Sequence, residues 1–104
     1  VEVHTVAHVT GGGIAGNLAR VLSEGADALV ERSSWEAPRI FGEIQRLGSV
    51  TDDEMAKVFN LGIGMVVAVP AAAADAALGV LADAGHQGRV IGEVVAGAGN
   101  VRFQ

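Results

Sequence analysis

The chain has 104 residues, half of them apolar, which is enough for one small domain with its own core and no more. Twelve acidic against seven basic residues give a net charge of −5, with Lys57 as the single lysine, which argues against a nucleic-acid-binding surface. The absence of cysteine excludes disulfides and thiolate chemistry. No apolar run approaches the ~20 residues that a membrane span needs, and no signal peptide is visible.

The first predicted strand covers residues 2–9, and its alternating pattern places His4 and His8 on one face. At ~3.3 Å per residue the two histidines lie roughly 13 Å apart, too far to share one metal ion. His8 is the last polar side chain before a run of glycines, so we expect it to face a ligand bound there. The alternative is a hydrogen-bonded histidine that only ends the strand.

Three consecutive glycines, residues 11–13, separate this strand from a helix predicted over residues 14–22. Without Cβ atoms the backbone can be approached closely by a ligand. The first N–H groups of the helix have no partner within it, and its dipole favours negative charge at the same point. The pattern therefore predicts an anion site, with phosphate as the usual ligand. The alternative is a plain glycine turn between a strand and a helix.

The middle of the chain predicts a strand and two helices. Gly25 is expected to cap the first helix in the left-handed conformation, before a strand over residues 26–31. Pro38 suits the first turn of the next helix, whose apolar spacing continues to Gly48. Trp35 is predicted to be a core anchor beside that helix, with ligand stacking as the alternative.

A short third helix is predicted after Thr51, because residues 51–54 form a capping box. Met55, Val58 and Phe59 would be its buried side. The acidic residues of the box are explained by their capping position, so we predict no metal site there.

The last part of the chain predicts a strand over residues 66–69 and an alanine-rich helix over residues 71–84. Strands over residues 89–95 and 101–103 are joined by a glycine turn and are expected to form a hairpin. The element order is therefore β-α-β-α-α-β-α-β-β. The hairpin and the mixed order predict an α+β fold, a mixed β-sheet with packed helices.

The glycines also fit a dinucleotide-binding fingerprint. Gly11, Gly13 and Gly16 satisfy G-x-G-x-x-G between a strand and a helix. Glu31 stands twenty residues after Gly11, where such folds place a ribose-binding acid, and Arg32 could reach a 2′-phosphate. Two successive helices and a terminal hairpin argue against this interpretation, since the later segments do not continue as βαβ units.

A longer set of short motifs occurs in register over nearly the whole chain. The motifs are Ala7-His8-Val9-Thr10-Gly11-Gly12-Gly13, Asn17, Arg20-Val21-Leu22, Ser33-Ser34-Trp35, Glu54-Met55, Phe59-Asn60, Gly62-Ile63-Gly64-Met65 and Ile91-Gly92-Glu93-Val94. Together they resemble the C-terminal part of the phosphoribosylformylglycinamidine cyclo-ligases, also called aminoimidazole ribonucleotide synthetases. Ser23 departs from a common proline, and Val58 from a common threonine, which puts in doubt any ligand role for a hydroxyl at residue 58.

The resemblance implies a two-domain cytoplasmic enzyme of purine biosynthesis, a homodimer in its full-length form. It closes formylglycinamidine ribonucleotide into aminoimidazole ribonucleotide with ATP. An N-terminal domain would carry most of the ATP and Mg²⁺ machinery and the main dimer contacts. Residues 1–104 would be the later part of the C-terminal domain, the other wall of the cleft, and inactive alone. A non-catalytic interaction domain of the same superfamily is a further alternative.

The residue patterns and the resemblance together predict one site around the glycines. We expect His8 to serve as an acid–base residue and no side chain to bind a metal. The expected contacts to the substrate and its phosphate are Thr10, Gly11, Gly12, Gly13, Asn17 and Asn60.

Overall fold

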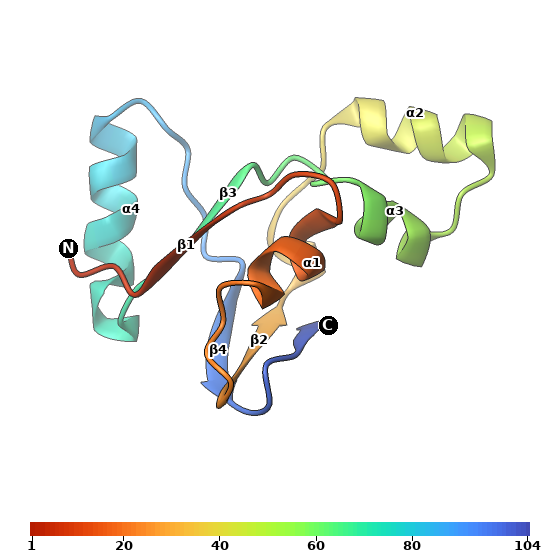
Figure 1. Cartoon of the computed structure of the whole chain (residues 1–104). Helices are drawn as coiled ribbons and strands as arrows, with labels where there is room; N and C mark the ends of the chain where they lie inside the picture. The colour runs from red at the N-terminus through yellow and green to blue at the C-terminus, as the bar shows by residue number, and fades with distance from the viewer.

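The computed structural model describes all 104 residues and is elongated, about 42 × 34 × 20 Å (Figure 1). In chain order its elements are β1 (Thr5–His8), α1 (Gly13–Ala19), β2 (Ala26–Val30), η1 (Arg32–Ser34), α2 (Arg39–Gly48), α3 (Asp52–Val58), β3 (Met65–Ala68), η2 (Ala71–Ala73), α4 (Ala74–Asp83), β4 (Gly92–Ala96) and β5 (Val101–Phe103). The predicted α+β class and the order of strands and α-helices along the chain are confirmed. None of the helices is both long and apolar enough to cross a membrane.

The strands form two separate sheets instead of the single mixed sheet that was predicted. β1 and β3 make an antiparallel ribbon, whereas β2 lies between antiparallel β4 and parallel β5 in a mixed sheet. Ala28 is paired with Val94 on one side and with Val101 on the other. The predicted hairpin of the last two strands is therefore wrong, because β2 separates them.

Asp27 explains why the last two strands do not pair with each other. Its buried carboxylate accepts hydrogen bonds from the backbone N–H of Ala98 (2.8 Å) and Asn100 (2.9 Å) and forms an ion pair with Arg102 (3.2 Å). A Cβ on Gly97 would collide with the Asp27 carboxylate. The connection between β4 and β5 thus wraps around the start of β2 instead of folding back as a tight turn.

We expect the free energy of unfolding to depend on pH through the carboxyl group of Asp27. The N–H groups of Asn100 and Ala98, followed by Arg102, hold the pKa of the Asp27 carboxyl below its ordinary value of 3.8. A folded-state pKa below the unfolded one gives stability that is present above the unfolded pKa and is lost as the pH falls through the folded pKa. Chemical denaturation between about pH 7 and pH 3 should therefore show a smaller loss of stability in Asp27→Asn than in wild type. A variant whose pH slope matches that of the exposed control Asp83→Asn would contradict this role.

The core is small and gathers around α1 and β2. Of 104 residues only twelve are buried, so the packing centre has few members. Its apolar members are Ala7, Val9, Ile14, Leu18, Ala28, Val30, Trp35, Met55 and Leu61. The prediction that Trp35 is a core anchor is confirmed, since its indole N–H donates to the Leu61 carbonyl at 3.1 Å.

The helix ends are partly as predicted. The Thr51 hydroxyl accepts the N–H of Glu54 (3.2 Å), which confirms the cap of α3. Gly25 is not left-handed, so its predicted capping role is wrong. α1 stops earlier, at Ala19, because the N–H groups that follow turn back onto Leu18. Val58, predicted to be buried, is 46% exposed.

Two elements expose apolar faces. α2 has no buried residue, and its Ile40, Ile44 and Leu47 point into solvent. The ribbon of β1 and β3 exposes Val6 and Val67, which pair across the two strands. Apolar patches of this kind commonly mark surfaces that contact another protein segment.

Candidate functional site

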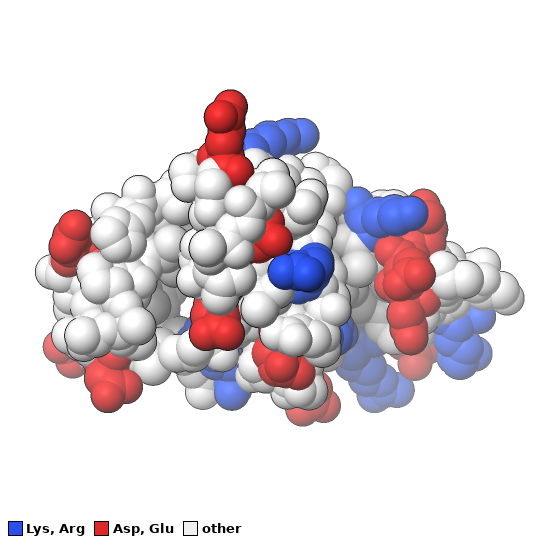
Figure 2. Space-filling model, turned by 90° about the horizontal axis from the view of Figure 1, so that it is seen from below, with Lys and Arg blue, Asp and Glu red and all other residues white.

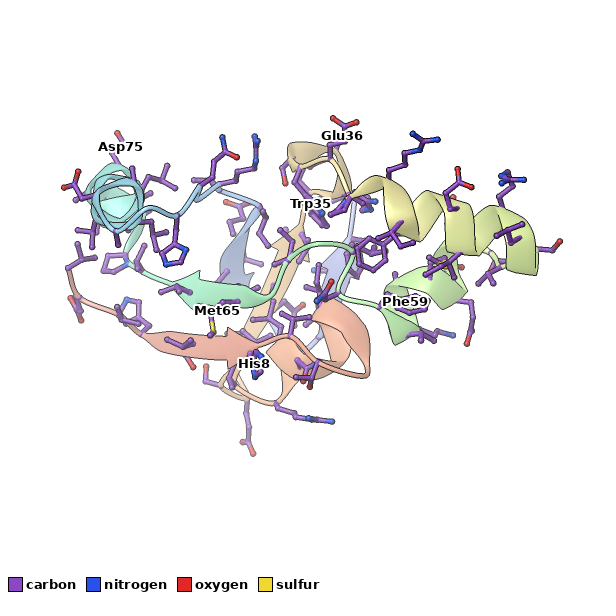
Figure 3. The ribbon with its side chains drawn as sticks, turned by 90° about the horizontal axis from the view of Figure 1, so that it is seen from above. His8, Trp35, Glu36, Phe59, Met65 and Asp75 are labelled. Carbon is purple, nitrogen blue, oxygen red and sulfur yellow. The ribbon has the colours of Figure 1, made fainter.

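Two loops lie side by side at the end of the ribbon, and we call them the two-loop site: residues 10–13 and residues 60–64. The β1–β3 pairing continues past His8, where the Val9 N–H donates to the Gly64 carbonyl at 2.9 Å. The first loop also rests on the end of α3, since a Cβ on Gly13 would collide with the Ala56 carbonyl oxygen. Figure 3 shows His8 at the end of β1, where the chain continues into the glycine loop, and Phe59 at the entry to the second loop. The structure therefore brings the predicted residues of both loops into one region.

The backbone of the two-loop site is unusual. Gly12 (φ 101°), Gly13 (φ 70°) and Gly62 (φ 98°) are left-handed, and so is Leu61 (φ 55°). A buried leucine in this conformation is strained, and such strain persists only where the surroundings impose it. Here the indole N–H of Trp35 holds the Leu61 carbonyl. Strained residues of this kind cluster at functional sites, which favours a role for this region.

The N–H groups of Gly11 and Gly12 are available to a ligand. Both residues are exposed, and neither N–H donates a hydrogen bond within the chain. No atom lies within 4 Å of the position that a Cβ on Gly11 would take. α1 has only seven residues, so its dipole is small. An anion would therefore be bound mainly by hydrogen bonds from the backbone N–H groups of Gly11 and Gly12.

Asn17 faces the first loop from inside. It is only 5% exposed, and its amide N–H groups donate to the carbonyls of Gly13 (2.8 Å), Thr10 (3.1 Å) and Gly11 (3.3 Å). Its carbonyl oxygen accepts from the Thr10 hydroxyl (3.2 Å) and from Arg20 (3.4 Å). A direct contact from Asn17 to substrate stays a prediction, but its polar atoms already have partners in the loop and in Arg20.

His8 stands on the outward face of the ribbon. It is exposed, pairs across the strands with Met65, and takes part in none of the side-chain hydrogen bonds or ion pairs of the chain. The alternative of a hydrogen-bonded histidine at the strand end is not what the structure shows. Its imidazole is therefore free to accept or donate a proton beside the glycine loop.

Asn60 belongs to the second loop. Its side-chain oxygen accepts the N–H of Gly62 at 2.8 Å and so shapes the turn through Leu61. Its NH₂ group makes no hydrogen bond in the chain and is free to donate. Contact of Asn60 with substrate stays a prediction.

No group of three or more His, Asp or Glu side chains is arranged to hold a metal ion. In the acidic segment that opens α3, Asp52 accepts a hydrogen bond from Gln45 (2.6 Å). Figure 2 shows acidic and basic side chains interspersed on the face seen from below, without a continuous basic surface. The two loops themselves therefore offer uncharged groups: backbone N–H groups, the amide of Asn60 and the hydroxyl of Thr10.

The dinucleotide-binding alternative is wrong. It requires the first two strands to be parallel neighbours in one sheet, and β1 and β2 lie in different sheets. The Arg32 guanidinium is stacked 4.7 Å from the centre of the Trp35 ring, and Glu31 accepts from the Ser33 hydroxyl at 3.3 Å.

The bond from Trp35 to the strained Leu61 carbonyl was not predicted from the sequence. The available signal was the turn-prone pair Asn60 and Gly62 around a leucine. A groove of about 580 Å³ runs beside this contact, between Trp35, Phe41 and Met55. The aromatic ring of Phe41 packs edge-on against Phe59, with centroids 5.8 Å apart. The second loop is thus fixed by Trp35, and Phe59 at its entry packs against Phe41. The sequence of the loop alone does not predict these contacts.

Comparisons with known proteins agree on one family. The family model described as AIR synthase related protein, C-terminal domain, matches residues 1–103. A phosphoribosylformylglycinamidine cyclo-ligase of Magnetococcus marinus is 45% identical over 92 residues, covering 88% of this chain and 26% of the relative. A protein of the same name from Paraburkholderia phymatum is 52% identical over 94 residues, covering 90% of this chain and 26% of the relative. The chain thus spans about a quarter of the length of these curated relatives.

Proposed function

The chain belongs to the AIR synthase related family, whose C-terminal domain it matches, and on that premise we propose that it works as the later part of the C-terminal domain of a phosphoribosylformylglycinamidine cyclo-ligase. The reaction is the ATP-dependent ring closure of formylglycinamidine ribonucleotide to aminoimidazole ribonucleotide, in cytoplasmic purine biosynthesis. Support comes from relatives that carry the cyclo-ligase name and align with 88–90% of this chain.

We assign the substrate's phosphate to the glycine loop. The free N–H groups of Gly11 and Gly12 are the observation that carries this assignment. Exposed backbone amides without partners suit the oxygens of a phosphate monoester. The NH₂ group of Asn60 lies in the same two-loop site and adds a neutral donor. The Thr10 hydroxyl directs its proton at Asn17, so a contact from Thr10 to the phosphate would require that bond to be exchanged.

We assign a proton transfer to His8. Ring closure forms a carbon–nitrogen bond between an amidine nitrogen and the formyl carbon, whose oxygen leaves as phosphate after activation by ATP. The attacking nitrogen loses a proton in this step, and a neutral imidazole at the edge of the loop can accept it. The exposed, unpaired side chain of His8 is in keeping with that task.

ATP and Mg²⁺ would be held mainly by an N-terminal domain outside this chain, in a protein about four times as long. That domain would also supply the main contacts of a homodimer. The residues described here form no metal-binding group of their own. Because the proposed ATP-binding domain lies outside residues 1–104, we expect these residues alone to have no turnover.

The Gly11→Val variant tests this assignment in the longer protein. Gly11 meets no atom within 4 Å and is not left-handed, so a side chain there leaves the fold intact and obstructs only an approaching ligand. We expect the KM for the ribonucleotide to rise about tenfold or more while the KM for ATP is unchanged. The matched control is Gly79→Val on the exposed side of α4, where no atom lies within 4 Å either.

If Gly11→Val increased the KM for ATP and left the KM for the ribonucleotide unchanged, the glycine loop would be assigned to ATP and not to the phosphate of the ribonucleotide. If the intact wild-type protein bound neither substrate, a non-catalytic interaction domain would be the better interpretation.

A further inference from the structure

The buried amide of Asn17 determines which way the glycine loop presents its peptide groups. Its two N–H groups are directed at three carbonyl oxygens, those of Thr10, Gly11 and Gly13, at 2.8–3.3 Å. No buried side-chain nitrogen or oxygen in the chain lacks a partner, so this amide is fully engaged.

The direction of the loop N–H groups follows from the planarity of the peptide. In a trans peptide the carbonyl of one residue and the N–H of the next point in opposite directions. A Thr10 carbonyl turned inward to Asn17 therefore directs the Gly11 N–H outward, and an inward Gly11 carbonyl does the same for Gly12. These are the two exposed N–H groups that have no partner in the chain.

We infer that Asn17 is a positioning residue, which aims the Gly11 and Gly12 N–H groups at the phosphate of the ribonucleotide without touching it. This inference rests on the proposed function, because it takes the phosphate monoester to be the ligand of the loop. The left-handed Gly12 and Gly13 can adopt several backbone conformations. Asn17 selects one of them before the ligand arrives, which lowers the entropy cost of binding.

The acceptor side of Asn17 strengthens this arrangement. Its oxygen accepts from the Thr10 hydroxyl (3.2 Å) and from the Arg20 guanidinium (3.4 Å). The orientation of the side-chain amide is fixed, because a flipped amide would place its NH₂ against the Arg20 guanidinium and its oxygen against the three loop carbonyls. Only the observed orientation lets its nitrogen reach the carbonyls of the loop.

The test is equilibrium binding by calorimetry in the longer protein, with formylglycinamidine ribonucleotide and ATP titrated separately. Asn17→Ala should raise the Kd of the ribonucleotide about tenfold or more and leave the Kd of ATP unchanged. Asn17→Ser, which retains one donor, should fall between wild type and Asn17→Ala, and it serves as the test if the alanine variant does not fold. The matched control is Asn100→Ala, an exposed asparagine whose side chain makes no hydrogen bond.

The outcomes separate the two claims. An Asn17→Ala protein with unchanged affinity for the ribonucleotide, while Gly11→Val loses affinity, would overturn the positioning role and leave the proposed function standing. An equal loss of both ligands would show a general structural effect and also overturn the positioning role. Unchanged ribonucleotide affinity in Gly11→Val would refute the phosphate assignment on which this inference rests.

Discussion

Gly13→Ala is expected to lower the free energy of unfolding by about 3 kcal/mol or more, enough to unfold much of the chain. The added Cβ would collide with the carbonyl oxygen of Ala56 in α3 and would lie 3.1 Å from the Phe59 carbonyl oxygen. Both obstacles are backbone atoms, so neither can move aside as a side chain would. The residue is also left-handed at φ 70°, where alanine costs about a further 1 kcal/mol. Chemical denaturation followed by far-UV circular dichroism measures the change.

Gly16→Ala is the matched control for this prediction. Gly16 lies in the same helix, has an ordinary φ, and has no atom within 4 Å of the position that an added Cβ would take. Alanine at this helical position should stabilise the chain by about 0.5–1 kcal/mol. Equal stability of the two variants would show that α1 does not rest on the backbone of α3 as the structure describes.

His8→Ala is expected to lower kcat of the longer protein about a hundredfold or more, with little change in either KM. The physical reason is the loss of the imidazole that is proposed to accept the proton of the attacking nitrogen. The limb of the kcat–pH profile that reports this group should disappear in the variant. Steady-state kinetics across about pH 6 to pH 9 tests both effects.

The control for His8 is His4→Ala, because His4 also precedes the glycine loop and is exposed, with only a 4.0 Å contact to Glu2. It should behave as wild type. A His8→Ala variant with unchanged kcat and an unchanged pH profile would remove His8 from proton transfer, although it would leave the phosphate assignment intact.

Local patterns were sufficient to predict most elements, because each is encoded within a few residues. The Thr51 cap is such a case, since a hydroxyl and an N–H three residues apart decide it. The pairing of the last two strands was predicted wrongly because it depends on Asp27, more than seventy residues away from its partners Ala98 and Asn100. No local pattern predicts that the connection between β4 and β5 will wrap around the buried carboxylate of Asp27 instead of forming a tight turn.

The sequence was sufficient to predict which residues belong to the candidate site, but not what each of them contacts. The glycines and His8 stand out in the sequence because of their spacing after a strand. That Asn17 turns inward onto the loop became visible only in the structure, because its partners are backbone carbonyls whose direction depends on φ and ψ. Trp35 is similar, since its indole holds a carbonyl 26 residues further along the chain.

The most direct test of the central claim is a crystal structure of the longer protein with formylglycinamidine ribonucleotide bound. We predict that a phosphate oxygen lies within ~3.2 Å of the backbone nitrogen of Gly11 or Gly12, with His8 on the side of the ring that forms. A well-ordered ribonucleotide whose phosphate is bound only by other residues, away from residues 10–13, would contradict the account.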